Sequence, residues 1–131
     1  MTTRIFLVED HPVMREAYSN LLDLESDLEL CGVEETAEAF LEVLQTTPCD
    51  LVLTDLSLPG MDGITLVARL QDERPELPTI VISAHEEPIY RERARQAGAR
   101  AYLTKRDLAP QLAPTIRRVV AESAPPPSTE G

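Results

Sequence analysis

Short apolar runs alternate with segments of helical periodicity along nearly the whole chain. The runs cover residues 4–9, 28–33, 50–54, 79–83 and 100–103. In the segments between them, apolar residues recur every three or four positions, which is the period of one helix face. This alternation is typical of parallel sheets whose two faces are covered by helices. We therefore expect an α/β fold with a doubly wound, five-stranded parallel sheet and five helices.

The strand order that we expect is flavodoxin-like, 2-1-3-4-5, with right-handed crossovers that bring the first and third strands together. Thr36 is the expected N-cap of the second helix, and Gly98 is expected to end the fourth. Pro114 predicts an irregular start or a kink in the last helix. Apolar stripes are expected on the first helix at Val13, Ala17, Leu21 and Leu24, and on the third at Ile64, Val67, Ala68 and Leu70.

The length of the chain, 131 residues, suits one domain and is too short for two. We assign this domain to residues 1–123 and expect the proline-rich segment 124–131 to be a disordered tail or linker. Cys31 and Cys49 have neither the number nor the spacing of a disulfide framework or a metal site. Free thiols, at least half-buried, are therefore expected at both positions.

The net charge of −11 argues against direct binding to nucleic acid, because such binding requires a basic face. No stretch approaches the roughly 20 apolar residues that cross a bilayer. The first expected strand begins too early to leave room for a signal peptide. The sequence therefore predicts no membrane contact and a cytoplasmic location.

Polar side chains lie where four of the expected strands end. Asp55 follows the third apolar run, and Glu9 and Asp10 follow the first. Ser83 ends the fourth run, and Lys105 comes shortly after the fifth. Because open α/β sheets bind ligands at the carboxyl ends of their strands, we expect these five side chains to converge at one edge. Three carboxylates, a hydroxyl and an ammonium suit a divalent cation and a phosphoryl group.

The chemistry of such a set is specific. A carboxylate reacts poorly with an anionic phosphoryl donor unless their mutual repulsion is neutralised, and Mg²⁺ is a hard cation that prefers oxygen ligands. Asp10 and Asp55 can each supply one oxygen to this ion. Lys105 offers a point charge to a phosphoryl oxygen, and Ser83 places a hydroxyl where such an oxygen would arrive. A serine that only caps the next helix is the alternative for Ser83.

These residues and their flanking segments resemble the receiver domain of two-component response regulators, over about residues 4–122. The segments that carry the resemblance, most similar to the NarL/FixJ class, are Glu9-Asp10-His11-Pro12, Asp55-Leu56-Ser57-Leu58-Pro59-Gly60-Met61-Asp62-Gly63 and Gly98-Ala99-Arg100-Ala101-Tyr102-Leu103-Thr104-Lys105. The resemblance implies that Asp55 accepts a phosphoryl group from a sensor histidine kinase. It also implies that the backbone carbonyl of Ser57 binds Mg²⁺ and that Glu9 acts on the ion through water.

The resemblance further implies a conformational switch that involves Ser83 and Tyr102. In this switch, phosphorylation changes the region of the fourth strand, fourth helix and fifth strand, and Tyr102 turns inward. The changed surface would control an output domain, a partner protein or a phosphorylation-dependent homodimer. A half-buried strand tyrosine is an equally good interpretation of Tyr102. His85 occupies a position that tunes dephosphorylation in the family, although an exposed loop histidine is favoured there.

Two other functions share the fold. An aspartate-nucleophile phosphatase would need a second acid two residues after the nucleophile, where this chain has Ser57. A nucleotide- or flavin-binding module would need a glycine-rich loop after the first strand, where this chain has Glu9-Asp10-His11-Pro12. We therefore expect a signalling switch with no ordinary substrate, whose only catalysis is its own phosphorylation and dephosphorylation.

Overall fold

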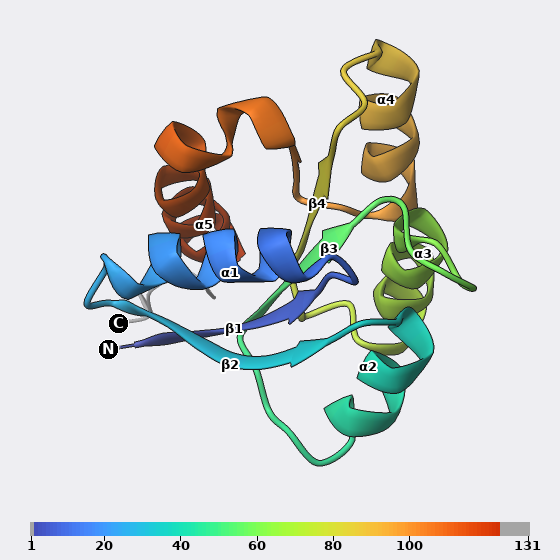
Figure 1. Ribbon diagram of the computed structural model, residues 1–131. Helices are drawn as coiled ribbons and strands as arrows, with labels where there is room; N and C mark the ends of the chain where they lie inside the picture. Colours follow the sequence, from blue (N-terminus) through green and yellow to red (C-terminus); the bar gives the residue numbers. More distant parts are fainter. Residues whose placement is uncertain (1, 124–131) are drawn as a thin grey trace, which may run out of the picture.

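The computed structural model describes residues 2–123 as a parallel five-stranded sheet covered by helices on both faces (Figure 1). The strands are β1 (Thr3–Val8), β2 (Leu28–Glu34), β3 (Leu51–Asp55), β4 (Thr79–Ser83) and β5 (Ala101–Thr104). The helices are α1 (Pro12–Asp23), α2 (Ala37–Leu44), α3 (Gly63–Glu73), α4 (Pro88–Ala97) and α5 (Leu108–Ser123). The strand order is β2-β1-β3-β4-β5, so the expected fold and order are confirmed.

The two faces of the sheet carry separate apolar cores. Ile5 and Leu7 of β1 pack with buried residues of α1 and α5. Phe6, which points to the other face because side chains alternate along a strand, packs against Phe40 of α2 with 4.8 Å between the ring centroids. Every residue of β3 and β4 is buried, as expected for central strands covered on both sides.

The predicted helix ends are largely confirmed. The Thr36 side chain accepts a hydrogen bond from the Ala39 N–H at 3.1 Å and so caps α2. Gly98 ends α4 in the left-handed region, with φ of 117°, which a residue without a Cβ adopts most easily. The irregularity expected at Pro114 is not seen, because α5 runs through this residue, and the 3₁₀ turn over Lys105–Asp107 lies before the helix.

The buried face of α1 is only partly the one predicted. Ala17 and Leu21 of the expected stripe are half-buried, and Leu21 packs against the core. Val13 and Leu24 are 79% and 78% exposed, while Tyr18 and Leu22 are buried. Apolar residues four apart occur on two faces of this helix. Tyr18 lies on the face that packs on the sheet, but its hydroxyl made it look less apolar than the residues of the predicted stripe. A similar error occurs in α3, where Ala68 is exposed.

The predicted disordered tail, residues 124–131, lies outside the residues that the structure describes. Cys31 and Cys49 are half-buried free thiols, as expected. Across residues 2–123, no helix combines the length and apolar character that a membrane span requires.

Candidate functional site

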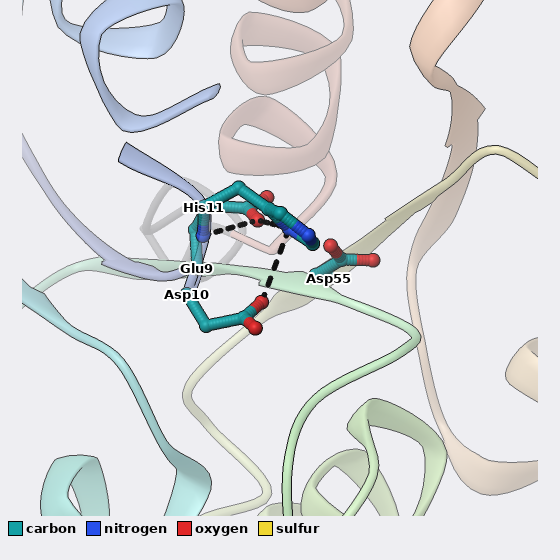
Figure 2. Close-up of side chains that lie close together, drawn as sticks. All are labelled: Glu9, Asp10, His11 and Asp55. Atoms are coloured by element: carbon teal, nitrogen blue, oxygen red, sulfur yellow. Dashed lines mark hydrogen bonds and ion pairs between the residues drawn. The ribbon is translucent and has the colours of Figure 1, made fainter. Parts of the chain in front are cut away.

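The carboxyl ends of β1 and β3 bring the predicted acidic residues together. The two strands are paired, with Val8 opposite Thr54, so the residues that follow them lie side by side. The Glu9 and Asp55 side chains are only 0% and 3% exposed. One carboxylate oxygen from each of Glu9, Asp10 and Asp55 lies within 4.8 Å of the others and of a His11 ring nitrogen (Figure 2).

Lys105, at the turn between β5 and α5, reaches into this cluster. Its Nζ lies 2.9 Å from Asp55 Oδ2 and 3.9 Å from Glu9 Oε1. Lys105 is also the single lysine among the chain's 12 basic residues, and the others are arginines. Among the described residues, the cation that pairs with the Asp55 carboxylate is therefore a compact ammonium on a flexible stem.

The loop after β3 fixes the Asp55 side chain from the other side. The backbone N–H of Ser57 donates a hydrogen bond to Asp55 Oδ1 at 3.1 Å. Gly63 allows the loop to return closely, because a Cβ at that position would lie 2.2 Å from the Asp55 carbonyl oxygen. Each Asp55 carboxylate oxygen thus has one protein donor and retains a lone pair for a further ligand.

The acidic cluster is electrostatically unfavourable without a cation. Burial raises the pKa of Glu9, and the nearby Asp55 charge raises it further. Among the described residues, Glu9 Oε1 and Asp10 Oδ1 are buried and accept no hydrogen bond. Buried carboxylate oxygens without donors are costly, and a divalent cation would compensate both. The residues present therefore fit an oxygen-ligated cation.

His11 belongs to this cluster, although the sequence analysis gave it no role. Its Nδ1 lies 3.1 Å from Glu9 Oε2 and 3.3 Å from Asp10 Oδ1, and the ring is 63% exposed. Its backbone N–H also donates to Glu9 Oε2 at 3.2 Å. The available signal was its position, directly after the acidic pair and before the proline that begins α1.

Ser83 and Tyr102 both contact the backbone of the loop that joins β4 to α4. Ser83 Oγ accepts a hydrogen bond from the His85 N–H at 3.0 Å, and the Tyr102 hydroxyl donates to the His85 carbonyl at 2.7 Å. Tyr102 is only 6% exposed. Tyr102 is thus already turned inward in this conformation, and the expectation that phosphorylation changes its position stays a prediction.

His85 is held in place more firmly than an exposed loop histidine. Its ring stacks on Tyr90 of α4, with 4.3 Å between the centroids and 19° between the planes. The loop from β4 to α4 is therefore tied to α4 and β5 as well as to Ser83. By contrast, α4 itself buries only Ala94, which makes it a weakly anchored element, as its sequence indicated.

Comparison with known families identifies the family to which this chain belongs. The family described as "Response regulator receiver domain" matches residues 5–117. The chain is a receiver domain of two-component response regulators. Receiver domains are phosphoacceptor signalling modules, so the two alternative functions considered from the sequence are not favoured.

Individual relatives agree with this assignment. The chain is 36% identical over 104 residues to the "Probable transcriptional regulatory protein NarL" of Mycobacterium tuberculosis, covering 78% of this chain and 47% of the relative. The solved receiver domain of the putative response regulator NarL from M. tuberculosis has a TM-score of 0.85 and 28% identity, covering 92% of this chain and 97% of that one. A LuxR-family response regulator from Aurantimonas sp. has a TM-score of 0.88 and 28% identity, covering 93% and 87%.

The receiver spans about half the length of the curated relatives it matches. Response regulators act with histidine kinases and output domains, and this chain corresponds to their receiver part. Receivers are signalling proteins and not enzymes in the ordinary sense.

Proposed function

We propose that Asp55 is the phosphoacceptor of this receiver and takes its phosphoryl group from a sensor histidine kinase. The observation that carries the proposal is the Asp55 carboxylate, 3% exposed, with Lys105 Nζ 2.9 Å from Oδ2. A buried carboxylate that is paired with a single mobile ammonium and surrounded by two further acids is poorly explained as a helix cap. It is well arranged for phosphoryl transfer, which depends on positioning and charge neutralisation.

Three residues around Asp55 have different roles in the proposed phosphoryl transfer. The Ser57 N–H holds Oδ1 in place, which leaves the carboxylate facing the open edge of the sheet. Lys105 neutralises Asp55 before transfer, and its ammonium can then follow the charge to a phosphoryl oxygen. The Ser83 hydroxyl lies at the end of the neighbouring strand, one residue beyond Ile82, which pairs with Asp55. We assign it the role of second donor to the phosphoryl group.

We further propose Mg²⁺ as the cofactor, with Asp10 and Asp55 as direct ligands. The backbone carbonyl of Ser57 is the third protein ligand in this proposal, and Glu9 acts through water. The oxygens Glu9 Oε1 and Asp10 Oδ1 support it, because in the described part of the chain they accept no hydrogen bond. Their ion-pair contacts, to Lys105 Nζ at 3.9 Å and to His11 Nδ1 at 3.3 Å respectively, leave room for a further cation. When bound, the ion would offset the negative charge of the incoming phosphoryl group.

The signal that follows is a change in the loop between β4 and α4, in α4 and in β5. Ser83 and Tyr102 both hold the backbone of His85, so a hydroxyl that turns to a phosphoryl oxygen would alter this loop directly. An output domain, a partner protein or a second phosphorylated copy would detect the change. Autophosphorylation from small donors, slow autodephosphorylation and a cytoplasmic location are parts of the same proposal.

The proposal is tested with the variant Asp55→Asn. Wild-type protein incubated with Mg²⁺ and acetyl phosphate should gain the mass of one phosphoryl group, and Asp55→Asn should gain none. Asp72→Asn, on the exposed side of α3, is the matched control and should be modified like the wild type. A phosphoryl adduct on Asp55→Asn at the wild-type rate would refute the assignment.

A further inference from the structure

A second polar site lies along the free edge of the sheet, away from the acidic cluster of Glu9, Asp10 and Asp55. β5 is the edge strand, and α4 and α5 lie apart on the two sides of this edge (Figure 1). Between them is a hollow of about 420 Å³. A volume of this size is typical of sites for small molecules. None of the residues proposed above to bind Mg²⁺ or the phosphoryl group lines it.

The lining of this hollow is strongly basic, against the charge of the whole chain. It contains four of the 12 basic residues and none of the 23 acids. The four are Arg91, Arg95, Arg100 and Arg118. A third of the positive charge of a chain with net charge −11 therefore surrounds one hollow. Such a concentration favours anions locally while the rest of the surface repels them.

Two of these arginines have no carboxylate partner among the residues that the structure describes. Arg95 pairs with Glu92 on its own helix, and Arg118 pairs with Glu122 at 3.3 Å. Arg91 donates to the backbone carbonyl of Tyr102 at 3.0 Å.

Arg100 likewise meets only neutral oxygens. It donates to the Ser123 hydroxyl at 2.8 Å and to the Pro75 carbonyl at 3.3 Å. Within residues 2–123, Arg91 and Arg100 thus have no carboxylate partner, and an anion would supply one to both.

We propose that this hollow binds a small polyanion, a compound with two or more phosphate or carboxylate groups. Guanidinium groups bind both kinds of group through paired N–H donors, and all four cations here are arginines. Arg91 and Arg100, which lack carboxylate partners in the described chain, lie on α4 and directly before β5, and this separation along the chain favours a ligand with more than one anionic group. The size of the hollow, about 420 Å³, suits a small molecule.

The hollow is connected to the loop beside the phosphorylation site through one tyrosine. The Arg91 guanidinium lies 5.0 Å from the centroid of the Tyr102 ring. The hydroxyl of the same tyrosine holds the carbonyl of His85 at 2.7 Å. A ligand that draws Arg91 away from the Tyr102 ring would therefore disturb the contact of Tyr102 with the loop between β4 and α4. This coupling rests on the proposed function, whereas binding of the polyanion does not.

The binding is tested by titrating the full chain with pyrophosphate and, separately, with citrate, while amide shifts are followed by ¹H–¹⁵N NMR. Mg²⁺ is omitted, so that the cluster of Glu9, Asp10 and Asp55 repels both probes. Saturable shifts should appear at amides around the hollow, such as Ala94 and Ala101, and not beside Asp55. Whichever probe binds more tightly identifies the anionic group as phosphate or carboxylate.

Variants locate the site. Arg91→Gln and Arg100→Gln should each weaken binding about tenfold, and unchanged amide spectra away from the hollow would show that they remain folded. Arg69→Gln is the matched control, because Arg69 is exposed on α3, pairs with Glu73 and does not line the hollow. Asp55→Asn should bind like the wild type, which separates this site from the phosphoacceptor.

Three results would overturn the proposal. They are the absence of saturable shifts with either probe, equal weakening by Arg69→Gln and Arg91→Gln, and tighter binding of a hexaglutamate peptide than of both small anions. The last result would assign the hollow to an acidic protein segment. A failure of Asp55 to accept phosphate would leave the binding result intact and would remove only the coupling.

Discussion

The ammonium of Lys105 lies 2.9 Å from Oδ2 of Asp55, although 50 positions separate the two residues in the sequence. Sheet topology produces this contact, because β3 and β5 flank β4 and all three strands end at the same edge. The chain uses arginine at its other 11 basic positions. A guanidinium would hold the Asp55 carboxylate with a planar fork, whereas an ammonium can transfer to a new oxygen.

Lys105→Arg should therefore be defective even though it keeps the charge. We expect phosphorylation by acetyl phosphate to slow by roughly 10- to 100-fold, because the loss of one positioned donor typically costs that much or more. Lys105→Ala should be at least as slow. The rate is measured by intact mass against time at saturating Mg²⁺.

Arg106→Ala is the control for this variant, since Arg106 is adjacent, 74% exposed in its side chain and paired with Glu86. It should be phosphorylated at the wild-type rate. If Lys105→Arg also matched the wild type, the ammonium would have no special role at Asp55.

Binding of Mg²⁺ should stabilise the folded domain before any phosphorylation. A ligand that binds only the folded state, at a concentration about thirtyfold its Kd, adds about 2 kcal/mol to the free energy of unfolding. For a domain of this size, that is a rise of about 8 °C in Tm. Asp10→Asn should lose most of this rise, because Asp10 Oδ1 has no donor of its own. Thermal melts with and without Mg²⁺ measure this rise in Tm, and Asp72→Asn is the control. A full Mg²⁺ response in Asp10→Asn would contradict the ligand set.

The sequence predicted the fold and the convergence of the acids for a common reason. Apolar runs mark buried parallel strands, and side chains at their carboxyl ends must then meet at one edge. Interactions set by tertiary contacts were not predictable in this way. The predicted face of α1 was wrong at two of its four positions, because Val13 and Leu24 fit the helical period as well as Tyr18 and Leu22 do. The orientation of Tyr102 depends on a carbonyl in another loop.

The basic hollow is a further feature that the sequence did not reveal. Its arginines come from three separate parts of the chain, namely α4, the residue before β5, and α5. In the linear sequence they look like ordinary surface charges. Only the arrangement of the three elements shows that two of them lack carboxylate partners in the part of the chain described.

Glu9 should make the unliganded domain less stable as pH rises. Its folded-state pKa is raised by burial and by Asp55 above the ordinary value of 4.5. The unfolded chain therefore ionises this group first, and the folded state loses stability as pH rises from about that value through the folded-state pKa. Without Mg²⁺, Glu9→Gln should have a higher Tm than the wild type at pH 7.

The advantage of Glu9→Gln should vanish below the ordinary pKa of glutamate, where the wild-type carboxyl is protonated in both states. Thermal melts from below this pKa up to pH 7 measure the difference in Tm between Glu9→Gln and the wild type. Glu16→Gln, on the exposed face of α1, is the control. A difference in Tm that stays constant with pH would show that the effect comes from packing and not from the charge of Glu9.

Ser83→Ala should accept the phosphoryl group at Asp55 but fail to transmit it. Ser83 Oγ accepts from the His85 N–H at 3.0 Å, while its own proton remains available for a phosphoryl oxygen. One hydroxyl can thus join the phosphoryl group to the loop of residues 84–87, and alanine cannot. Wild-type protein with beryllofluoride should change its amide exchange across residues 84–103, whereas Ser83→Ala with beryllofluoride should not.

Ser57→Ala is the control, because it keeps the backbone N–H at Asp55, and it should behave like the wild type. An equal change in exchange in Ser83→Ala would show that the signal leaves the site by another route, because no other side chain at this edge contacts the His85 N–H in the described structure.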